Sequence, residues 1–288
     1  MNVLIIFSYR WAFYYALQGI KKHSRNSIDF ASYNSITFKE AIEYDTIYIL
    51  NHLCWHRIEK RWGRRLANKL CESKNVILGV GSKKNTVAAL KTINRVKFSY
   101  IRVASHYIKS YLDTKAKLRN VKVVQHGVDT NIFKPQVTQR KGFTVGWAGK
   151  YRREEKRTHL LERLGYNLKI GSNIDYFKMP DFYNGVDVYV CVSNAESSPM
   201  PVLEAMACGL PVISTEVGLV PEVLQREWIV PAMPEERVVE LTRGKLKKLC
   251  DDVNLRKDVG DRNLREIQSN WSSKVRAKYW DRLFIEGL

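Results

Sequence analysis

Long apolar runs are missing from this chain of 288 residues, and no stretch of eighteen apolar residues occurs in it. A helix that spans a bilayer needs about 20 such residues, so the sequence predicts no spanning helix. The first residues, Met1 to Ser8, lack a basic leader and a cleavage site, which indicates a first β-strand and not a signal peptide. Apolar residues still make up 45% of the chain, enough for a core, which argues against disorder.

Cysteines are few and widely spaced, and no Cys-x-x-Cys pair of the kind that holds zinc occurs. Their number is odd, and they stand at Cys54, Cys71, Cys191, Cys208 and Cys250. This pattern favours reduced thiols in a cytosolic protein over a disulfide framework or a zinc site.

Acidic residues are scarce relative to basic ones, with 29 Asp and Glu against 48 Lys and Arg and a net charge of +19. The imbalance is uneven along the chain. Residues 1–137 contain 24 basic and 8 acidic residues, whereas residues 138–288 contain 24 and 21. The first half therefore carries +16 of the total, and a surface of this charge attracts polyanions, either nucleic acid or an anionic membrane.

Short apolar runs alternate with helical patterns along the whole chain. In the first half, strands are expected at 3–7, 28–31, 46–50, 76–80 and 121–125, with helices at 12–22, 56–70, 87–92 and 106–118. In the second half, strands are expected at 144–148, 168–170, 186–192, 212–214 and 229–230, followed by helices at 235–250 and 255–269 and a terminal segment at 272–284. This alternation predicts an α/β fold with two doubly wound parallel sheets, joined by a linker at 135–142.

Two glutamates, Glu196 and Glu204, lie eight positions apart between two of the predicted strands. Glu196 is expected on the loop at the carboxyl end of the first strand, and Glu204 in the first turn of a helix at 202–208. Open α/β sheets bind ligands at this edge. A carboxylate there can accept two hydrogen bonds from a ribose diol, and free N–H groups suit phosphate oxygens. The structural alternatives are a favourable acid at a helix start and a solvated loop residue.

The run that contains this pair resembles the Glu-x7-Glu signature of retaining nucleotide-sugar glycosyltransferases, in particular glycosyltransferase family 4. Three further segments match that family in the right order, at 123–135, at 143–150 with Glu155 and Lys156 after it, and at 179–190. The resemblance covers roughly residues 98–225, and four motifs in order are specific where any one would be weak. It implies the GT-B fold, in which two Rossmann-like domains face each other across a cleft.

The resemblance also assigns roles to single residues. Lys150 and Lys156 match the basic residues that grip the donor diphosphate, whose negative charge grows as the glycosidic bond breaks. Glu196 matches the glutamate near the donor sugar, and Glu204 the one that holds the ribose. A solvated surface charge is the alternative for either lysine, and it is stronger for Lys156, which lies within a run of charges. The remaining donor-binding positions are Gly149, Ser198, Pro199, Met200 and Val202. No metal is implied.

The chain departs from the family pattern at several points. Pro201 has no N–H and removes one potential phosphate donor, although it also suits the first position of a helix. Where the family often has two glycines, only Gly218 is present, and Leu219 takes the second place. The glycine-rich loop near the amino terminus is absent from 5–11, and the histidine often found after a later strand is absent from 76–82. The last two changes fall on the acceptor side.

Candidate acceptor residues follow the first predicted strand. Tyr9, Arg10 and Trp11 begin an aromatic cluster at 9–15, and His126 lies in the segment expected to enter the second domain. Core packing explains some of these rings. Their other role is to stack against an acceptor, for which a flipped base or a sugar ring would suit.

The segment 55–70 combines aromatic and basic residues at helical spacing. One face carries Trp55, Ile58, Trp62, Leu66 and Leu70, and basic side chains crowd much of the rest. The commonest arrangement of this kind is a helix packed on its own sheet with a solvated basic side. Two alternatives are a helix lying in a membrane interface and a basic side that follows a phosphate backbone.

Together these observations predict a cytosolic, metal-independent, retaining hexosyltransferase with a UDP- or GDP-sugar as co-substrate and no cofactor. Residues 1–137 would bind the acceptor, residues 138–270 the donor, and a helix at 271–288 would return to the first domain. The acceptor is either a hydroxymethylated base of phage-type DNA or a membrane lipid or glycan, with the enzyme in the host cytoplasm or at the inner membrane face. The alternative is a non-catalytic nucleic-acid- or membrane-binding module on a decayed transferase fold.

Overall fold

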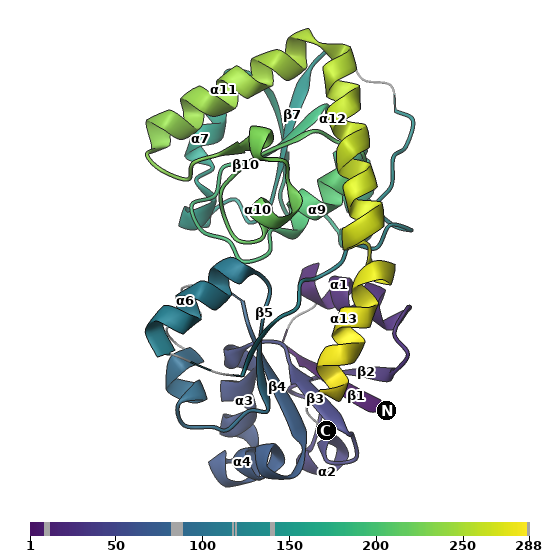
Figure 1. The fold of residues 1–288 in the computed structure, drawn as a ribbon, viewed down its shortest axis with the longest axis vertical. Coiled ribbons are helices and arrows are strands. Elements are labelled where there is room, and N and C mark those ends of the chain that lie inside the picture. The colour runs from purple at the N-terminus through teal and green to yellow at the C-terminus, as the bar shows by residue number, and fades with distance from the viewer. Residues whose placement is uncertain (9–11, 82–88, 117, 119, 139–141, 287–288) are drawn as a thin grey trace. The chain divides into compact units, whose positions relative to one another are not determined.

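A computed structural model describes residues 1–8, 12–81, 89–116, 118, 120–138 and 142–286. The chain divides into two compact units, each built around its own parallel sheet (Figure 1). Unit 1 comprises residues 1–127 and 276–288, and unit 2 comprises residues 128–275. In the described part of the chain, no helix is both long and apolar enough to cross a membrane.

Unit 1 contains a six-stranded parallel sheet with the order β2-β1-β3-β4-β5-β6. Its strands are β1 (Asn2–Phe7), β2 (Ser27–Ser32), β3 (Thr46–Ile49), β4 (Asn75–Val80), β5 (Tyr100–Val103) and β6 (Val121–Val123). Its helices are α1 (Ala12–Lys21), α2 (Phe38–Ala41), α3 (His52–Trp62), α4 (Arg64–Ser73), α6 (His106–Ala116) and α13 (Ser273–Ile285), of which α13 begins in the last residues of unit 2.

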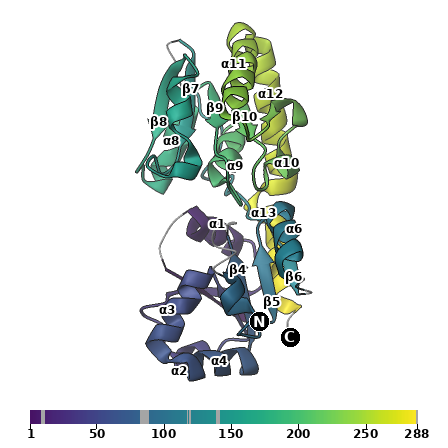
Figure 2. The ribbon, with the colours of Figure 1, turned by 90° about the vertical axis from the view of Figure 1, so that its left-hand side faces the viewer.

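The sheet of unit 1 is covered on both faces, because successive side chains of a buried strand point to opposite sides. Along β1, Leu4 and Ile6 pack with residues of α3, α4 and α6, whereas Val3 and Ile5 pack with residues of α1 and α13. Figure 2 shows α3 and α13 on opposite sides of the sheet, with β4 and β5 between them. Strands buried on both faces consist of nearly continuous apolar residues, and this is why β1 and β4 could be predicted from sequence.

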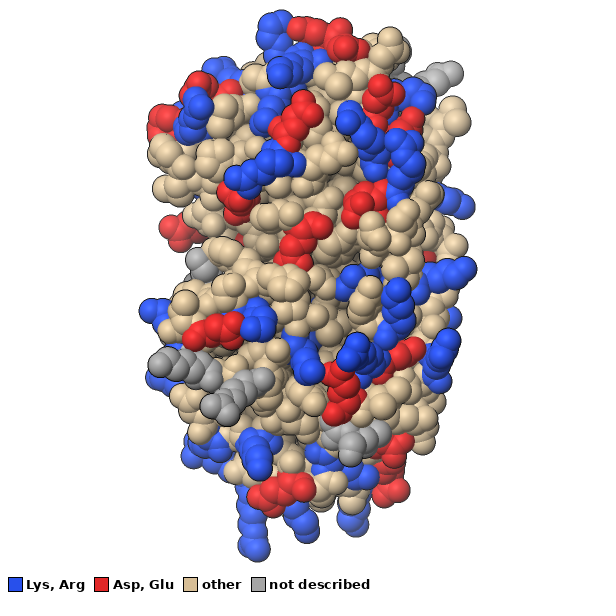
Figure 3. Space-filling view, viewed as in Figure 1, with Lys and Arg blue, Asp and Glu red and all other residues tan. Residues whose placement is uncertain are grey.

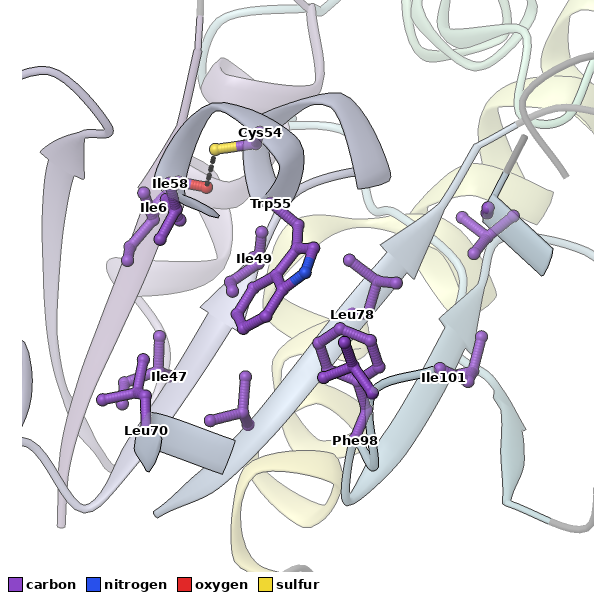
Figure 4. Close-up of a cluster of buried hydrophobic side chains, with 14 of the residues drawn as sticks. Ile6, Ile47, Ile49, Cys54, Trp55, Ile58, Leu70, Leu78, Phe98 and Ile101 are labelled. Atoms are coloured by element: carbon purple, nitrogen blue, oxygen red, sulfur yellow. Dashed lines mark hydrogen bonds between the residues drawn. The ribbon is translucent and has the colours of Figure 1, made fainter. Parts of the chain in front are cut away.

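The face covered by α3 and α4 holds the larger core of unit 1 (Figure 4). Trp55 is fully buried there and meets Phe98 edge to face, with ring centroids 5.0 Å apart. The Cys54 thiol donates to the Ile6 carbonyl oxygen, 3.6 Å away. Burial of a tryptophan contributes several kilocalories per mole, about 3–5 kcal/mol by truncation. The tryptophan face of the predicted amphipathic helix is therefore used for packing inside unit 1.

The predicted single helix at 56–70 is two helices, and this part of the sequence interpretation was wrong. Gly63 separates α3 from α4 with a φ of +81°, a conformation that favours glycine. The break changes which side chains face the sheet. Ala67 and Leu70 are buried, whereas Leu66, which we placed on the apolar face, is 40% exposed.

The carboxyl-terminal helix α13 is bound to unit 1 by polar contacts as well as by its apolar face. Asp281 accepts hydrogen bonds from the Ser24 hydroxyl, from the Arg25 backbone N–H at 3.0 Å and from the Asn26 side chain at 2.9 Å. The Trp280 indole N–H donates to the Gln125 carbonyl oxygen at 3.0 Å. Because these groups come from three distant parts of the chain, α13 completes the fold of unit 1.

Unit 2 contains a five-stranded parallel sheet with the order β11-β10-β9-β7-β8. Its strands are β7 (Thr144–Ala148), β8 (Asn167–Gly171), β9 (Val188–Cys191), β10 (Val212–Thr215) and β11 (Ile229–Val230). Its α-helices are α7 (His159–Glu162), α8 (Met179–Asn184), α9 (Met200–Ala207), α10 (Val220–Val223), α11 (Glu235–Asp251) and α12 (Val253–Glu266). Short helical turns are η1 (Glu154–Lys156), η2 (Tyr176–Lys178), η3 (Arg226–Trp228) and the π-helical η4 (Ile267–Trp271).

The unit boundaries at 127/128 and 275/276 differ from the sequence-based divisions at 137/138 and 270/271. Val128 explains the first difference, because it pairs with the segment that leads into α13. Its N–H donates to the Trp271 carbonyl oxygen at 3.0 Å, and its own carbonyl oxygen accepts from Ser273 N–H at 2.8 Å. The helix expected at 87–92 and the linker at 135–142 lie partly outside the described residues.

Candidate active site

The strand order of unit 2 predicts the place of a ligand site before any side chain is considered. From β7 the chain moves to β8 on one side of it and then to β9 on the other. The point between β7 and β9 is therefore a topological switch point, and open α/β sheets bind ligands at the carboxyl ends of the two strands there. The two segments that leave these ends contain Gly149 with Lys150, and Ser193 with Glu196.

Hydrogen bonds of two residues, Asn194 and Arg157, hold the η1 turn against the loop that follows β9. The Asn194 N–H donates to the Glu155 carbonyl oxygen at 3.0 Å. Arg157, which is only 2% exposed, donates to the carbonyl oxygens of Val192 at 2.7 Å and Ser193 at 3.2 Å. It also donates to the Ala232 carbonyl oxygen at 2.7 Å. Arg157 thus connects three loops, and this role was not predicted, because in sequence it is one cation in a charge run.

The result of this packing is an ion pair between Lys156 and Glu196, with side-chain exposures of 16% and 15%. Glu196 also accepts a hydrogen bond from the Ser193 hydroxyl at 3.0 Å. Burial alone would lower the pKa of the Lys156 ammonium, but the Glu196 carboxylate beside it holds that pKa above its usual value. Two residues predicted to act on one donor molecule are therefore in direct contact, and the solvated alternative for Lys156 is wrong.

Glu204 is buried, with 3% exposure, and one of its oxygens is 2.7 Å from the Tyr183 hydroxyl on α8, which donates to it. Burial raises the pKa of the Glu204 carboxyl to about 7, and the Tyr183 hydrogen bond acts in the opposite direction. Both side chains lie inside unit 2, where they form one polar pair. Tyr183 was missed from sequence, where it is one aromatic residue among several in 176–189.

Two details of the predicted donor site need correction. Helix α9 begins at Met200, two residues earlier than expected, so Glu204 is its fifth residue and lies beyond the first turn. The favourable position beside the helix start is thus not available to this carboxylate. In addition, the Val202 N–H donates to the Pro199 carbonyl oxygen at 2.9 Å, so this N–H is already used within the chain.

The other donor-site positions differ in exposure. Ser198, Pro199 and Met200 are buried where the loop enters α9. Gly149 has a φ of +153°, and a Cβ atom there would lie 3.2 Å from the Trp147 ring. Lys150 is exposed, and the partial burial of its ammonium, followed by the charge of Arg153, lowers its pKa.

A second loop closely approaches the glutamate loop. Gly218 has a φ of +54°, and a Cβ atom at this position would be 2.4 Å from the Ser197 carbonyl oxygen. The same oxygen accepts from the Leu219 N–H at 3.0 Å. The missing side chain of Gly218 therefore allows the two loops to approach each other this closely. Position 219 contributes only its backbone N–H, so leucine is compatible there.

Of the four candidate acceptor residues, the structure describes His126 alone. Tyr9, Arg10 and Trp11 lie outside the described residues. His126 is 1% exposed within unit 1, stacked on Phe13 with ring centroids 4.7 Å apart, and its Nε2 is 3.0 Å from Arg102 Nη1. Burial, assisted by the nearby Arg102 and Arg276 charges, lowers the pKa of His126 well below its usual value. The described contacts of His126 are thus all made within unit 1, and its role toward an acceptor stays a prediction.

The described residues contain no group of three His, Cys, Asp or Glu side chains placed to hold a metal ion. A metal-independent reaction therefore remains a prediction.

The chain resembles known proteins both in sequence and in structure. The family described as glycosyl transferases group 1 matches residues 106–263, more than half of the chain. No curated protein matches the sequence. Among solved structures, HepE of Anabaena in complex with UDP-glucose is 14% identical, with a TM-score of 0.77 and full coverage of both chains. Sucrose-phosphate synthase from Thermosynechococcus elongatus is also 14% identical, with a TM-score of 0.78 and coverage of 99% and 98%. A glycosyltransferase from Rickettsia africae is 12% identical, with a TM-score of 0.74 and coverage of 99% and 98%.

The two parallel sheets thus follow glycosyltransferase structures over nearly the whole chain, which confirms the predicted GT-B fold. The chain belongs to the group 1 glycosyltransferases, and the predicted enzyme class is confirmed with it.

Proposed function

We propose that this glycosyltransferase takes a sugar from a nucleotide-sugar and transfers it, with retention of configuration, to a hydroxyl of a polyanionic acceptor. The observation that carries the proposal is the pair of polar clusters beside the β7–β9 switch point of unit 2. One is the ion pair of Lys156 and Glu196, and the other is Glu204 with Tyr183. A nucleotide-sugar needs a group for the ribose, a cation for the diphosphate and an acceptor for sugar hydroxyls, and the two clusters contain one of each.

In this proposal Glu204 accepts hydrogen bonds from the ribose diol. Tyr183 occupies one of its oxygens, and a carboxylate has further lone pairs for the ligand. Glu196 orients the transferred sugar. Its contact with Lys156 does not exhaust the lysine, because an ammonium has three donors and can hold Glu196 and a phosphate oxygen together.

Transfer breaks the bond between the anomeric carbon and the diphosphate oxygen, and it forms a bond from the acceptor oxygen to the same face of that carbon. The acceptor proton passes to the departing diphosphate. Lys156 and Lys150 stabilise the charge that develops on that group, and they act mainly as fixed positive charges. The pKa of Lys156 is raised, which keeps this ammonium charged at neutral pH.

The polyanionic acceptor is supported by the charge of unit 1. Residues 1–127 and 276–288 contain 26 Lys and Arg against 9 Asp and Glu, a balance of +17, which leaves +2 for unit 2. A donor-binding unit near neutrality beside a strongly basic one suits an enzyme whose second substrate is negatively charged. The setting we propose is the cytosol, which cell fractionation tests.

The test is a set of donor-binding and transfer measurements on the Glu204→Ala and Lys150→Ala variants. We expect the first change to weaken binding of the nucleotide-sugar and the second to slow transfer more than it weakens binding. UDP- and GDP-sugars are both screened, and hydrolysis of the donor without acceptor provides the first readout. Wild-type turnover in both variants would refute the proposed roles. A wild-type protein that binds no nucleotide at all would favour the non-catalytic module.

A further inference from the structure

Helices α3 and α4 present a strip of cations that no acidic side chain balances. Lys60, Arg64, Arg65 and Lys69 are all exposed, and across the described residues none of these four side chains takes part in an ion pair or a hydrogen bond. Figure 3 shows basic side chains projecting from the end of unit 1 that carries α4. We call these four residues the α3–α4 basic strip.

The surface of unit 2 shows that this arrangement is not general for the protein. There, helical cations face acids one turn away, as in Lys247–Asp251 at 2.6 Å and Lys257–Asp261 at 2.7 Å. On α3 the acid is Glu59, which is 6% exposed and paired with Arg95 at 2.6 Å. Like charges one turn apart, such as Arg65 and Lys69, destabilise a helix. The strip is therefore unfavourable for the isolated fold unless an anion binds over it.

The start of α4 gives a second reason to expect an anionic partner. Gly63 provides no side-chain cap, and the first turn contains Arg64 and Arg65 with no acid. Cations at the amino end of a helix lie beside its positive pole. An anionic partner that lies across the strip would relieve both the repulsion between side chains and this unfavourable end.

We infer that the α3–α4 basic strip binds the phosphate backbone of duplex nucleic acid. An anionic membrane is the other common polyanionic surface. We favour nucleic acid because the apolar faces of α3 and α4 are already buried inside unit 1. A helix that lies in a bilayer interface needs a free apolar face. Here Trp55, Ile58 and Leu70 are fully buried in unit 1. Of the large apolar side chains on α3 and α4, Leu53 and Leu66 are exposed, one on each helix, and two single leucines do not make an apolar face. Phosphate recognition needs only the charged side chains, and arginine and lysine are the residues that supply it.

This inference names the acceptor class within the proposed function and rests on it. The experiment measures anisotropy of a labelled DNA duplex with the full chain across a salt series. The strip variant carries Lys60→Gln, Arg64→Gln, Arg65→Gln and Lys69→Gln. The control variant removes the same charge from unit 2 through four exposed cations, namely Arg226→Gln, Arg237→Gln, Lys247→Gln and Lys257→Gln.

Each phosphate contact contributes about 0.9 to the slope of log affinity against log salt, so loss of the strip should lower the slope by about 3 to 4. We expect the strip variant to bind the duplex at least about tenfold more weakly at low salt, with the control variant close to wild type. Equal losses in both variants would reduce the effect to total charge and overturn the inference. Stronger, strip-dependent binding to vesicles of phosphatidylglycerol and phosphatidylcholine would overturn it in favour of a membrane.

Nucleotide-sugar hydrolysis is measured in the same three proteins. We expect it to be unchanged in the strip variant, because the strip lies in unit 1 and the donor clusters in unit 2. Absence of hydrolysis and nucleotide binding in the wild type would defeat the proposed function, whereas the duplex measurement still decides whether the strip binds phosphate.

Discussion

The pH dependence of donor binding follows from the environment of Glu204. Burial raises the pKa of this carboxyl to about 7, and its proposed role requires the ionised form, which accepts hydrogen bonds from both ribose hydroxyls. The raised pKa means that a proton is bound below pH 7 and lost above it. The affinity for a nucleotide-sugar should therefore be greatest above pH 7 and fall by about tenfold for each pH unit well below it.

Tyr183 provides the sharper test, because its hydrogen bond favours the ionised carboxylate. The Tyr183→Phe variant removes that bond and keeps the ring, so the pKa of Glu204 should rise further. A hydrogen bond to a charged group contributes about 1.5 kcal/mol, which moves the midpoint of the profile upward by about 1 pH unit. Calorimetric titration with UDP- and GDP-sugars at a series of pH values measures the midpoint. At high pH, wild-type affinity should largely return.

A purely structural role for Tyr183 predicts something else, namely a uniform loss of affinity at all pH values. A flat wild-type profile, or a Tyr183→Phe profile with an unchanged midpoint, would refute the reasoning.

The pH dependence of protein stability gives an independent check on the pKa of Glu204. A carboxyl whose pKa rises from 4.5 to about 7 on folding lowers stability as pH increases through that range, by about 3 kcal/mol. Glu204→Gln should therefore raise the free energy of unfolding at pH 8 and leave it almost unchanged at pH 4, while it weakens donor binding.

Three further predictions concern other contacts. Lys156→Ala should lower kcat by about 10² or more, because it removes a fixed charge from the leaving group; an unchanged kcat in single-turnover transfer would contradict this. Asp281→Ala should destabilise the protein by about 2–4 kcal/mol in urea unfolding, since it leaves three donors without their acceptor. Its control is the exposed Arg282→Ala, and equal effects would argue against it. Gly218→Ala should weaken nucleotide binding, because its Cβ would lie 2.4 Å from the Ser197 carbonyl oxygen; wild-type affinity would show that the loop adapts.

The sequence predicted the elements whose apolar residues are continuous and bounded by turns. The strands at β1, β4, β7 and β10 were placed within a residue or two, since each is buried on both faces. Strand β5 was missed, because its buried Arg102 interrupts the apolar run at Tyr100–Val103. That guanidinium donates to the carbonyl oxygen of Val124 at 2.6 Å, and this partner, just after β6 and 22 positions away, leaves no local signal.

In the candidate site, too, residues within local motifs could be predicted, whereas residues that act through distant partners could not. Spacing and resemblance could place Glu196, Glu204 and Lys156, since motifs are local in sequence. Arg157 and Tyr183 act through partners 35 and 21 positions away, so only the folded chain identifies them. The break at Gly63 was likewise hidden, because the apolar spacing of 55–70 fits one helix almost as well as two.

The placement of α13 has a consequence for the order in which the protein forms during synthesis. Residues 128–275 leave the ribosome before α13 does, so unit 2 has its complete sequence while unit 1 still lacks its last helix. Until then, the face of the first sheet that contains Val3 and Ile5 lacks Trp280 and Phe284. Domains usually complete folding from the amino terminus onward. Here residues 1–127 are made before unit 2 but belong to the unit that is completed after it, and the part of their apolar surface that α13 covers waits for that helix.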